Sequence, residues 1–301
     1  MPVNVNDDWM NSTLWDQNAS LTRPALLTLK VKVYLQKEPA QTLTWTSNGS
    51  PRSQQTIAWD AASWRQWAID LTREVNEGWS NKLWLQPDSQ WRTDRAGDLL
   101  DMPFLSPIRL RLRIDCSVAR ANAHVIIRSY RLPEPTAANP RPFARSNMMA
   151  PYIQSHRDCS INGNDVIGNM DSRDVIPKTS GQIAAVHEFG HYIGLSHVNA
   201  AAVPNAPNSR RAYGVGAHQR ADIMGAGTRI EEWHAYPWCQ RLRRHLGGDQ
   251  PTTNGWHTQN PIKYITGMGE RRVTWTVRTG QIYPIVPDNI PVVRRDGTAL
   301  A

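Results

Sequence analysis

The sequence contains few cysteines and no pattern that would let cysteine side chains share a metal. Three cysteines occur in 301 residues, at Cys116, Cys159 and Cys239, and no C-x-x-C pair is present. A zinc site built from cysteine is therefore excluded, because such sites use closely spaced pairs. A Cys116–Cys159 disulfide stays open as an alternative, and free buried thiols are the default expectation.

Long apolar runs and a secretory leader are also absent. The chain has no run of about 18 apolar residues, the length that a membrane-spanning helix needs. Its first residues include neither the basic start nor the apolar core of a secretory signal. We expect cytoplasmic synthesis, followed by residence there or by export along a route that reads no such signal, unless the chain lacks its leader.

Acidic residues are fewer than basic ones, and the formal net charge is +8 at pH 7. This excess would suit a nucleic acid or another polyanion. The basic residues are dispersed, however, with small groups at 109–113, 241–244 and 294–295, and no nucleic-acid-binding module is present. Solvated basic faces are therefore the favoured interpretation, and no specific nucleic-acid partner is expected. An acidic substrate or cell-surface polymer stays open, and the oligomeric state is unknown.

Hydrophobic periodicity predicts an α+β chain. Alternation with a period of two predicts strands, and apolar residues at three- and four-residue intervals predict helices. Strands are expected at 27–35, 83–85, 108–114 and 124–130, and helices at 60–78 and 231–246. Residues 1–24 are polar and aperiodic and are interpreted as an extension. The C-terminal part favours strands at 264–266, 272–277 and 282–286, and its role is not assigned.

The stretch 179–197 carries the strongest functional signal. Thr179 and Gln182 form a capping-box pattern, which predicts that a helix begins there. His187 and His191 stand four positions apart, so both imidazoles project from one side of that helix. This is the geometry that two nitrogen ligands need to bind one zinc ion.

Gly194 can end this helix in a left-handed conformation, after which the chain can turn back and present His197 as a third ligand. The whole pattern, H-E-x-x-H-x-x-G-x-x-H, resembles the long zinc-binding signature of the metzincin metalloproteases. Downstream, the tetrapeptide D-I-M-G at 222–225 resembles the methionine-containing turn of that family. Met224 would then supply an apolar floor beneath the three imidazoles.

The resemblance implies a metzincin-like α+β fold. Such a fold has a twisted mixed sheet backed by two long helices, a zinc cleft and a small lower subdomain after the third histidine. It places the catalytic domain at 25–248, with the upper part ending at residue 197 and the lower part at 198–248. An N-terminal extension at 1–24 and a C-terminal, strand-rich extension at 249–301 would flank it.

The metal ligands implied by the resemblance are His187, His191 and His197, with one catalytic zinc ion. Three neutral imidazoles leave a fourth position for water, which is typical of a catalytic site. Glu188 would act as the general base while zinc-activated water attacks a peptide carbonyl. The expected function is a zinc-dependent endopeptidase acting on a protein or peptide. Two alternatives stay open: hydrolysis of cell-wall peptide cross-links, and a weakly active binding or effector protein on the same scaffold.

Two positions depart from better-known metzincin subgroups. Val198 follows the third histidine, where the large secreted subgroups carry their own characteristic residue. Ala226 stands two residues after Met224, so the tyrosine ligand of astacins and serralysins is not supplied there. Tyr213 and Tyr236 could assist, although packing is the commoner role for each.

A group of oxygen-bearing side chains is a candidate for binding Ca²⁺. Its members are Asn162, Asn164, Asp165, Asp171 and Asp174. Their spacing is not that of an EF-hand loop, so hydrogen-bonded turns are favoured over calcium binding.

Overall fold

The computed structural model describes residues 3–15, 25–47, 49–87, 108–117, 119–139, 142, 146–148, 158–166, 181–205, 209–245, 262–266, 269–273 and 275–279. Helices and a mixed sheet are both present, which confirms the α+β class. The chain divides into two compact units, each assembled from separate stretches. The first unit comprises 1–30, 79–113 and 230–301, and the second comprises 31–78 and 114–229.

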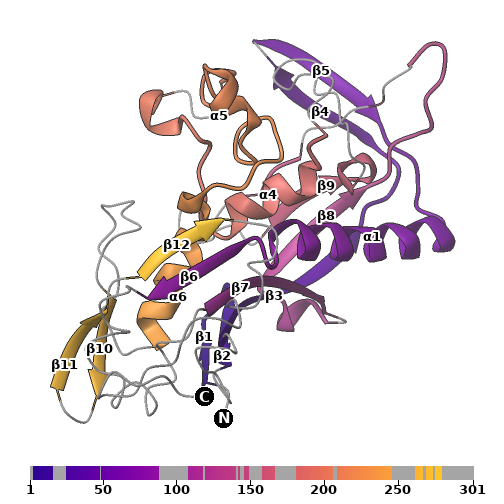
Figure 1. The fold of residues 1–301 in the computed structure, drawn as a ribbon. Coiled ribbons are helices and arrows are strands. Elements are labelled where there is room, and N and C mark those ends of the chain that lie inside the picture. Colours follow the sequence, from indigo (N-terminus) through magenta and orange to yellow (C-terminus); the bar gives the residue numbers. More distant parts are fainter. Residues whose placement is uncertain are drawn as a thin grey trace, which may run out of the picture. The chain divides into compact units, whose positions relative to one another are not determined.

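The second unit is built on parallel strands. Strand β3 (Ala25–Lys37) pairs through its last residues with β8 (Val125–Tyr130), and β8 pairs with β9 (Asp158–Asn162), as Figure 1 shows. On the far side of β9, Asn147 pairs antiparallel with Ser160. Along β3 the alternating residues Leu27, Leu29, Val31 and Val33 are fully buried, so burial of one face explains the period there. Strand β8 is buried on both faces apart from Arg128.

Helix α1 (Ala61–Trp79) matches the helix predicted at 60–78. Asp60 begins it, because its Oδ1 accepts hydrogen bonds from the backbone N–H groups of Ala62 and Ser63. The buried side of the helix consists of the apolar residues Trp67, Leu71 and Val75. Near its end, α1 packs closely against Val186 of helix α4 (Ala184–Tyr192), since a Cβ on Gly78 would lie 2.5 Å from Val186 Cγ1.

The second unit also contains a separate hairpin and several short elements (Figure 1). The hairpin pairs β4 (Thr42–Ser47) with β5 (Ser50–Gln55). The short helical elements are η2 (Arg120–Asn122), η3 (Gly163–Val166), η4 (Ala200–Ala202) and α5 (Ala217–Ala221).

The first unit contains a sheet whose strand order is β1-β2-β3-β7-β6-β12. Its remaining strands are β1 (Val3–Asn6), β2 (Asn11–Trp15), β6 (Leu83–Pro87), β7 (Ile108–Cys116) and β12 (Trp275–Thr279), with β10 (Ile262–Thr266) and β11 (Gly269–Val273) as a separate pair. A 3-10 turn, η5 (Glu232–Ala235), leads into helix α6 (Tyr236–His245). The strands predicted from 27 to 130 and the helix predicted at 231–246 are thus confirmed.

Some expectations about secondary structure were wrong. The N-terminal stretch contains strands β1 and β2, because β1 pairs with β2 and β2 pairs with β3 through backbone groups that every residue has. The run 272–277 is divided between β11 and β12. The strand expected at 282–286 lies outside the described residues. Only α1 is a long helix among the described helices, since α4 has 9 residues. The domain boundaries at 24/25 and 248/249 stay predictions.

None of the three cysteines forms a disulfide, so the alternative of a Cys116–Cys159 disulfide was wrong. The expectation of buried thiols holds for Cys159, whereas Cys116 is exposed. Within the described ranges, no helix combines the length and apolar character that crossing a membrane would require.

Candidate metal centre

Helix α4 places two histidines of the motif on one side. The helix begins at Ala184, so the predicted start near Thr179 was wrong. Ile183 has an extended backbone and no side-chain cap, and Thr179 lies outside the described residues. The side chain of Gln182 is also not a cap: it is buried and its Nε2 donates to the backbone oxygen of Ile223, 2.8 Å away.

The end of α4 matches the prediction made for Gly194, which has a φ of 109°. The Gly194 N–H donates to His191 O at 3.0 Å, and the Leu195 N–H donates to Gly190 O at 2.9 Å. These two bonds define a Schellman motif, in which the left-handed residue is usually glycine. The motif reverses the chain within a few residues and so delivers His197 to the side of the helix that carries the other two histidines.

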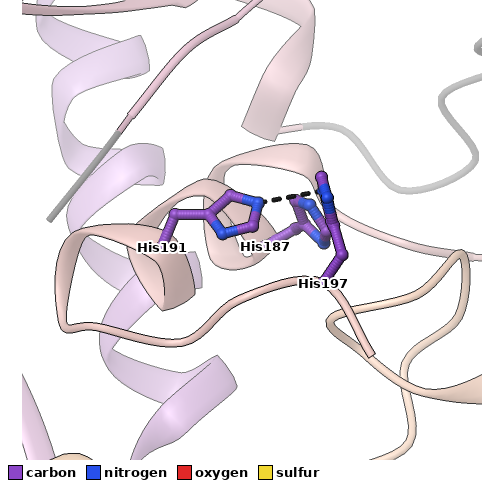
Figure 2. Close-up of side chains that lie close together, drawn as sticks. All are labelled: His187, His191 and His197. Atoms are coloured by element: carbon purple, nitrogen blue, oxygen red, sulfur yellow. Dashed lines mark hydrogen bonds between the residues drawn. The ribbon is translucent and has the colours of Figure 1, made fainter. Parts of the chain in front are cut away.

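The three histidines form one compact cluster. Their possible ligand atoms all lie within 4.8 Å of one another, and His187 and His197 are buried. Figure 2 shows the three imidazole rings turned toward one another, two from α4 and one from the segment that follows it. The Nε2 atoms of His191 and His197 are 3.1 Å apart. The structure therefore brings together the predicted ligand set, and this cluster could hold a metal ion.

Backbone carbonyl groups orient two of the rings. His187 Nδ1 donates to Ile223 O at 2.7 Å, and His191 Nδ1 donates to Leu195 O at 2.8 Å. Each Nδ1 therefore carries the ring proton, and each Nε2 keeps a lone pair for a metal. Among the described residues, the buried Nε2 of His187 has no hydrogen-bond partner.

The surroundings of His187 and His191 also favour the neutral form of these two rings. Burial lowers the pKa of His187 well below its ordinary value, and the neighbouring His191 and His197 lower it further. Burial lowers the pKa of His191 as well, although its hydrogen bond to Leu195 opposes this effect. Neutral imidazole is the form that binds a metal, so little proton competition is expected near pH 7.

Glu188 follows His187 on α4 and is partly buried. Its Oε2 accepts a hydrogen bond from the backbone N–H of Met148, 3.0 Å away. Met148 belongs to the segment 146–148 beside strand β9. The carboxylate of Glu188 is thus held by the backbone of a segment that is 40 residues away in the sequence.

The turn at 222–225 is tied to the histidine cluster. Met224 is fully buried, and its carbonyl oxygen accepts a hydrogen bond from the N–H of Val198, the residue after His197. Ile223 O accepts from both Gln182 and His187. Gly225 packs so closely against Gln219 O and Tyr213 O that a Cβ there would collide with backbone. These hydrogen bonds join the turn to the helix and to the segment that carry the histidines, and the role of Met224 as a floor beneath the imidazoles stays a prediction.

The ring of Tyr213, a residue expected at most to assist the site, packs against two histidines of the cluster. The ring centroids of Tyr213 and His197 are 3.9 Å apart, and those of Tyr213 and His187 are 5.6 Å apart. No local sequence signal joins Tyr213 or Gln182 to the motif, since each reaches it through the tertiary fold. Tyr236 belongs to the other compact unit.

Three of the five candidate calcium ligands lie among the described residues. Asn162 and Asp165 hydrogen-bond to each other, and Asn164 N–H donates to Asn162 Oδ1 at 2.9 Å. These contacts are those of a hydrogen-bonded turn. Asp171 and Asp174 lie outside the described residues.

Comparison of the chain with known proteins found no relative: no family model, no curated protein and no solved structure matches it.

Proposed function

We propose that this chain is a zinc-dependent endopeptidase of the metzincin type. The observation that supports this most strongly is the convergence of three imidazoles, those of His187, His191 and His197, with Glu188 following His187 on the same helix. The proposal depends on this geometry and on the motif, because no relative supplies independent support.

The donor set fits zinc. Zinc in proteins is bound by imidazole nitrogens at about 2.0–2.1 Å in tetrahedral geometry, so two such nitrogens lie about 3.3 Å apart. The Nε2 atoms of His191 and His197 are 3.1 Å apart, close to that value. The buried Nε2 of His187, with no hydrogen-bond partner among the described residues, provides the third donor. Three protein ligands, rather than four, are typical of catalytic zinc.

The protein's own groups suit hydrolysis of an amide bond. Zinc bound at the cluster would supply Lewis-acid chemistry, polarising a carbonyl and making water more acidic. Glu188 would accept the proton of the attacking water and return it to the leaving amine. The Met148 N–H holds Glu188 Oε2 and so restricts the directions in which this carboxylate can point.

The proposal also includes a metzincin-like fold. Its support is the Schellman motif at Gly194, the buried turn around Met224 and the parallel strands β3, β8 and β9 beside α4. The proposed upper part ends at His197 and the lower part follows it.

A second candidate is hydrolysis of peptide cross-links in an anionic cell-wall polymer. The formal net charge of +8 favours it, because a basic surface attracts a polyanion. The chemistry at the cluster would be the same, and only the substrate would differ.

The test measures metal content and cleavage of casein and of cell-wall fragments on the same preparations. It compares the unchanged chain with Glu188→Gln and with Glu232→Gln, an exposed control on η5. We expect one zinc ion per chain in all three, and loss of casein cleavage by at least about 100-fold only in Glu188→Gln.

The possible outcomes separate the parts of the proposal. Absence of zinc from the unchanged chain would contradict the metal assignment. Zinc without cleavage of casein would contradict the endopeptidase, and cleavage of the wall fragments alone would favour the second candidate. Full activity of Glu188→Gln would exclude Glu188 as the base.

A further inference from the structure

Asp165 is a buried carboxylate outside the histidine cluster, on η3 after strand β9, and it is 1% exposed. Its Oδ2 accepts hydrogen bonds from the Ser146 hydroxyl and, at 2.7 Å, from the Asn162 N–H. Its Oδ1 accepts from Asn162 Nδ2 at 2.9 Å. Asn162 Nδ2 also donates to Ser146 Oγ at 3.1 Å, so these three residues form a closed network.

This network is attached to the segment 146–148. Asn147 exchanges two backbone hydrogen bonds with Ser160 of β9, at 2.9 and 3.0 Å. The next residue, Met148, is 1% exposed, and its N–H donates to Glu188 Oε2 at 3.0 Å. Ser146 thus holds one end of a short segment whose other end holds the proposed base.

The cost in stability of burying the Asp165 carboxylate indicates that this side chain does more than fill space in the core. Burial raises the pKa of Asp165 to about 7, although the hydrogen bonds from Ser146 and Asn162 oppose the rise. A buried carboxylate of this kind costs stability, which an apolar side chain of similar size would not. Its oxygens, however, can accept from a hydroxyl and two N–H groups at once, whereas an amide has only one acceptor oxygen.

We propose that Asp165 is a positioning residue: through Ser146 it fixes the segment 146–148, so that the Met148 N–H holds the carboxylate of Glu188 in one orientation. The inference rests on the proposed function, because it takes Glu188 as the base. It assigns Asp165 no contact with substrate or metal. Its effect passes through backbone geometry, so both an exchange measurement and a kinetic measurement can detect it.

The test uses Asp165→Asn and the milder Ser146→Ala, with Glu38→Gln as the matched control. Glu38 is another buried carboxylate of the same unit, but its hydrogen-bond partners are Arg128 on strand β8, Gln36 and Gln41. Amide hydrogen exchange of the zinc-loaded protein is measured by NMR at Met148 and along β8. Zinc affinity, kcat and KM on a casein-derived peptide are measured on the same samples.

We expect Met148 exchange to accelerate by about 10-fold or more in Asp165→Asn and Ser146→Ala, with exchange along β8 unchanged. Zinc affinity should stay within about twofold, because the ligands keep their backbone partners. The kcat should fall by about 10- to 100-fold with KM unchanged, since a misplaced base weakens the chemical step alone. Glu38→Gln should change neither Met148 exchange nor kcat.

Unchanged Met148 exchange in both variants would overturn the inference, as would an equal acceleration along β8, which indicates general destabilisation. Accelerated exchange with unchanged kcat would also overturn it. Failure of the proposed function is recognised separately: if Glu188→Gln keeps its activity, Glu188 is not the base, whatever the exchange at Met148.

Discussion

Both compact units bury a polar cluster beside a histidine-bearing helix, but the two clusters pair their groups differently. In the first unit, Asp7 lies between two arginines of α6: Arg241 Nη1 is 2.5 Å from Asp7 Oδ2, and Arg244 Nη2 is 2.7 Å from Asp7 Oδ1. Opposite charges therefore meet there. His245, on the same helix, lies 2.9 Å from the hydroxyl of Ser12.

In the second unit, three imidazoles face one another: those of His187 and His191 on α4, and that of His197 in the segment that follows. Their Nδ1 atoms bond to backbone at His187 and His191, but the Nε2 atoms converge. Three imidazoles cannot form an ion pair with one another. Burial lowers the pKa of His187, and the neighbouring His191 and His197 lower it further. The difference is that the first cluster pairs opposite charges within the fold, whereas the second gathers groups that could hold a metal ion.

The largest effect is expected from removing one imidazole. His191→Ala should reduce zinc affinity by at least about 100-fold, because a ligand matters more than its outer-shell partners. His245→Ala, the matched change in the first unit, should leave zinc affinity unchanged. Metal analysis after dialysis and competition with a chelator measure both. Equal zinc binding by His191→Ala and the unchanged chain would remove the distinction between the clusters.

The next effect is expected from breaking the ion pairs of the first unit. Asp7→Ala leaves the guanidinium of Arg241, which is 2% exposed, without this carboxylate. The free energy of unfolding should fall by about 3 kcal/mol, the usual cost of leaving a buried charge uncompensated. Asp70→Ala, which breaks the exposed pair with Arg73, should cost less than about 1 kcal/mol. Urea unfolding measures both, and equal losses would show that burial of the first cluster is unimportant.

The smallest effect is a pH dependence in the first unit. Burial, with the charges of Arg241 and Arg244, lowers the pKa of His245 to about 4. Since this is below the unfolded value near 6.5, the neutral ring favours the folded state above pH 6.5. That contribution is lost as the pH falls from about 6.5 toward 4.

The measurement compares the unchanged chain with His245→Gln by urea unfolding at several pH values. The difference in unfolding free energy between the two should shrink by about 1 kcal/mol between pH 6.5 and 4, after allowance for solvent screening. Contributions from other titrating groups cancel in this difference. A difference that is independent of pH would contradict the lowered pKa of His245.

Much of the second unit was predictable from local patterns. The alternation that begins at Leu27 and the apolar spacing of α1 arise from burial of one face, so they leave a period in the sequence. The i, i+4 spacing of His187 and His191 and the glycine at 194 are likewise local. These features predicted the helix faces, the end of α4 and the ligand set before any tertiary contact was known.

Contacts between distant segments could not be predicted in this way. The Gln182 side chain was assigned to a helix cap, yet it bonds to Ile223, because a cap and a buried turn compete for the same amide. The alternation of valine and asparagine in β1 is only four residues long and β2 has no such alternation, so neither strand was distinguished from an extension. Nothing near Met148 in the sequence indicates that its N–H meets Glu188.

The sequence by itself determined which residue types stand at the spacing of a three-histidine site, and where the main strands and the long helix form. Only the tertiary structure decided that Ile223 and Leu195 orient the rings, that Tyr213 stacks on them and that Met148 holds Glu188. The physical reason is how far apart in the sequence the residues lie on which each feature depends. Periodicity and helix termini depend on residues a few positions apart, whereas the orientation of a site depends on backbone groups that packing brings together from distant parts of the chain.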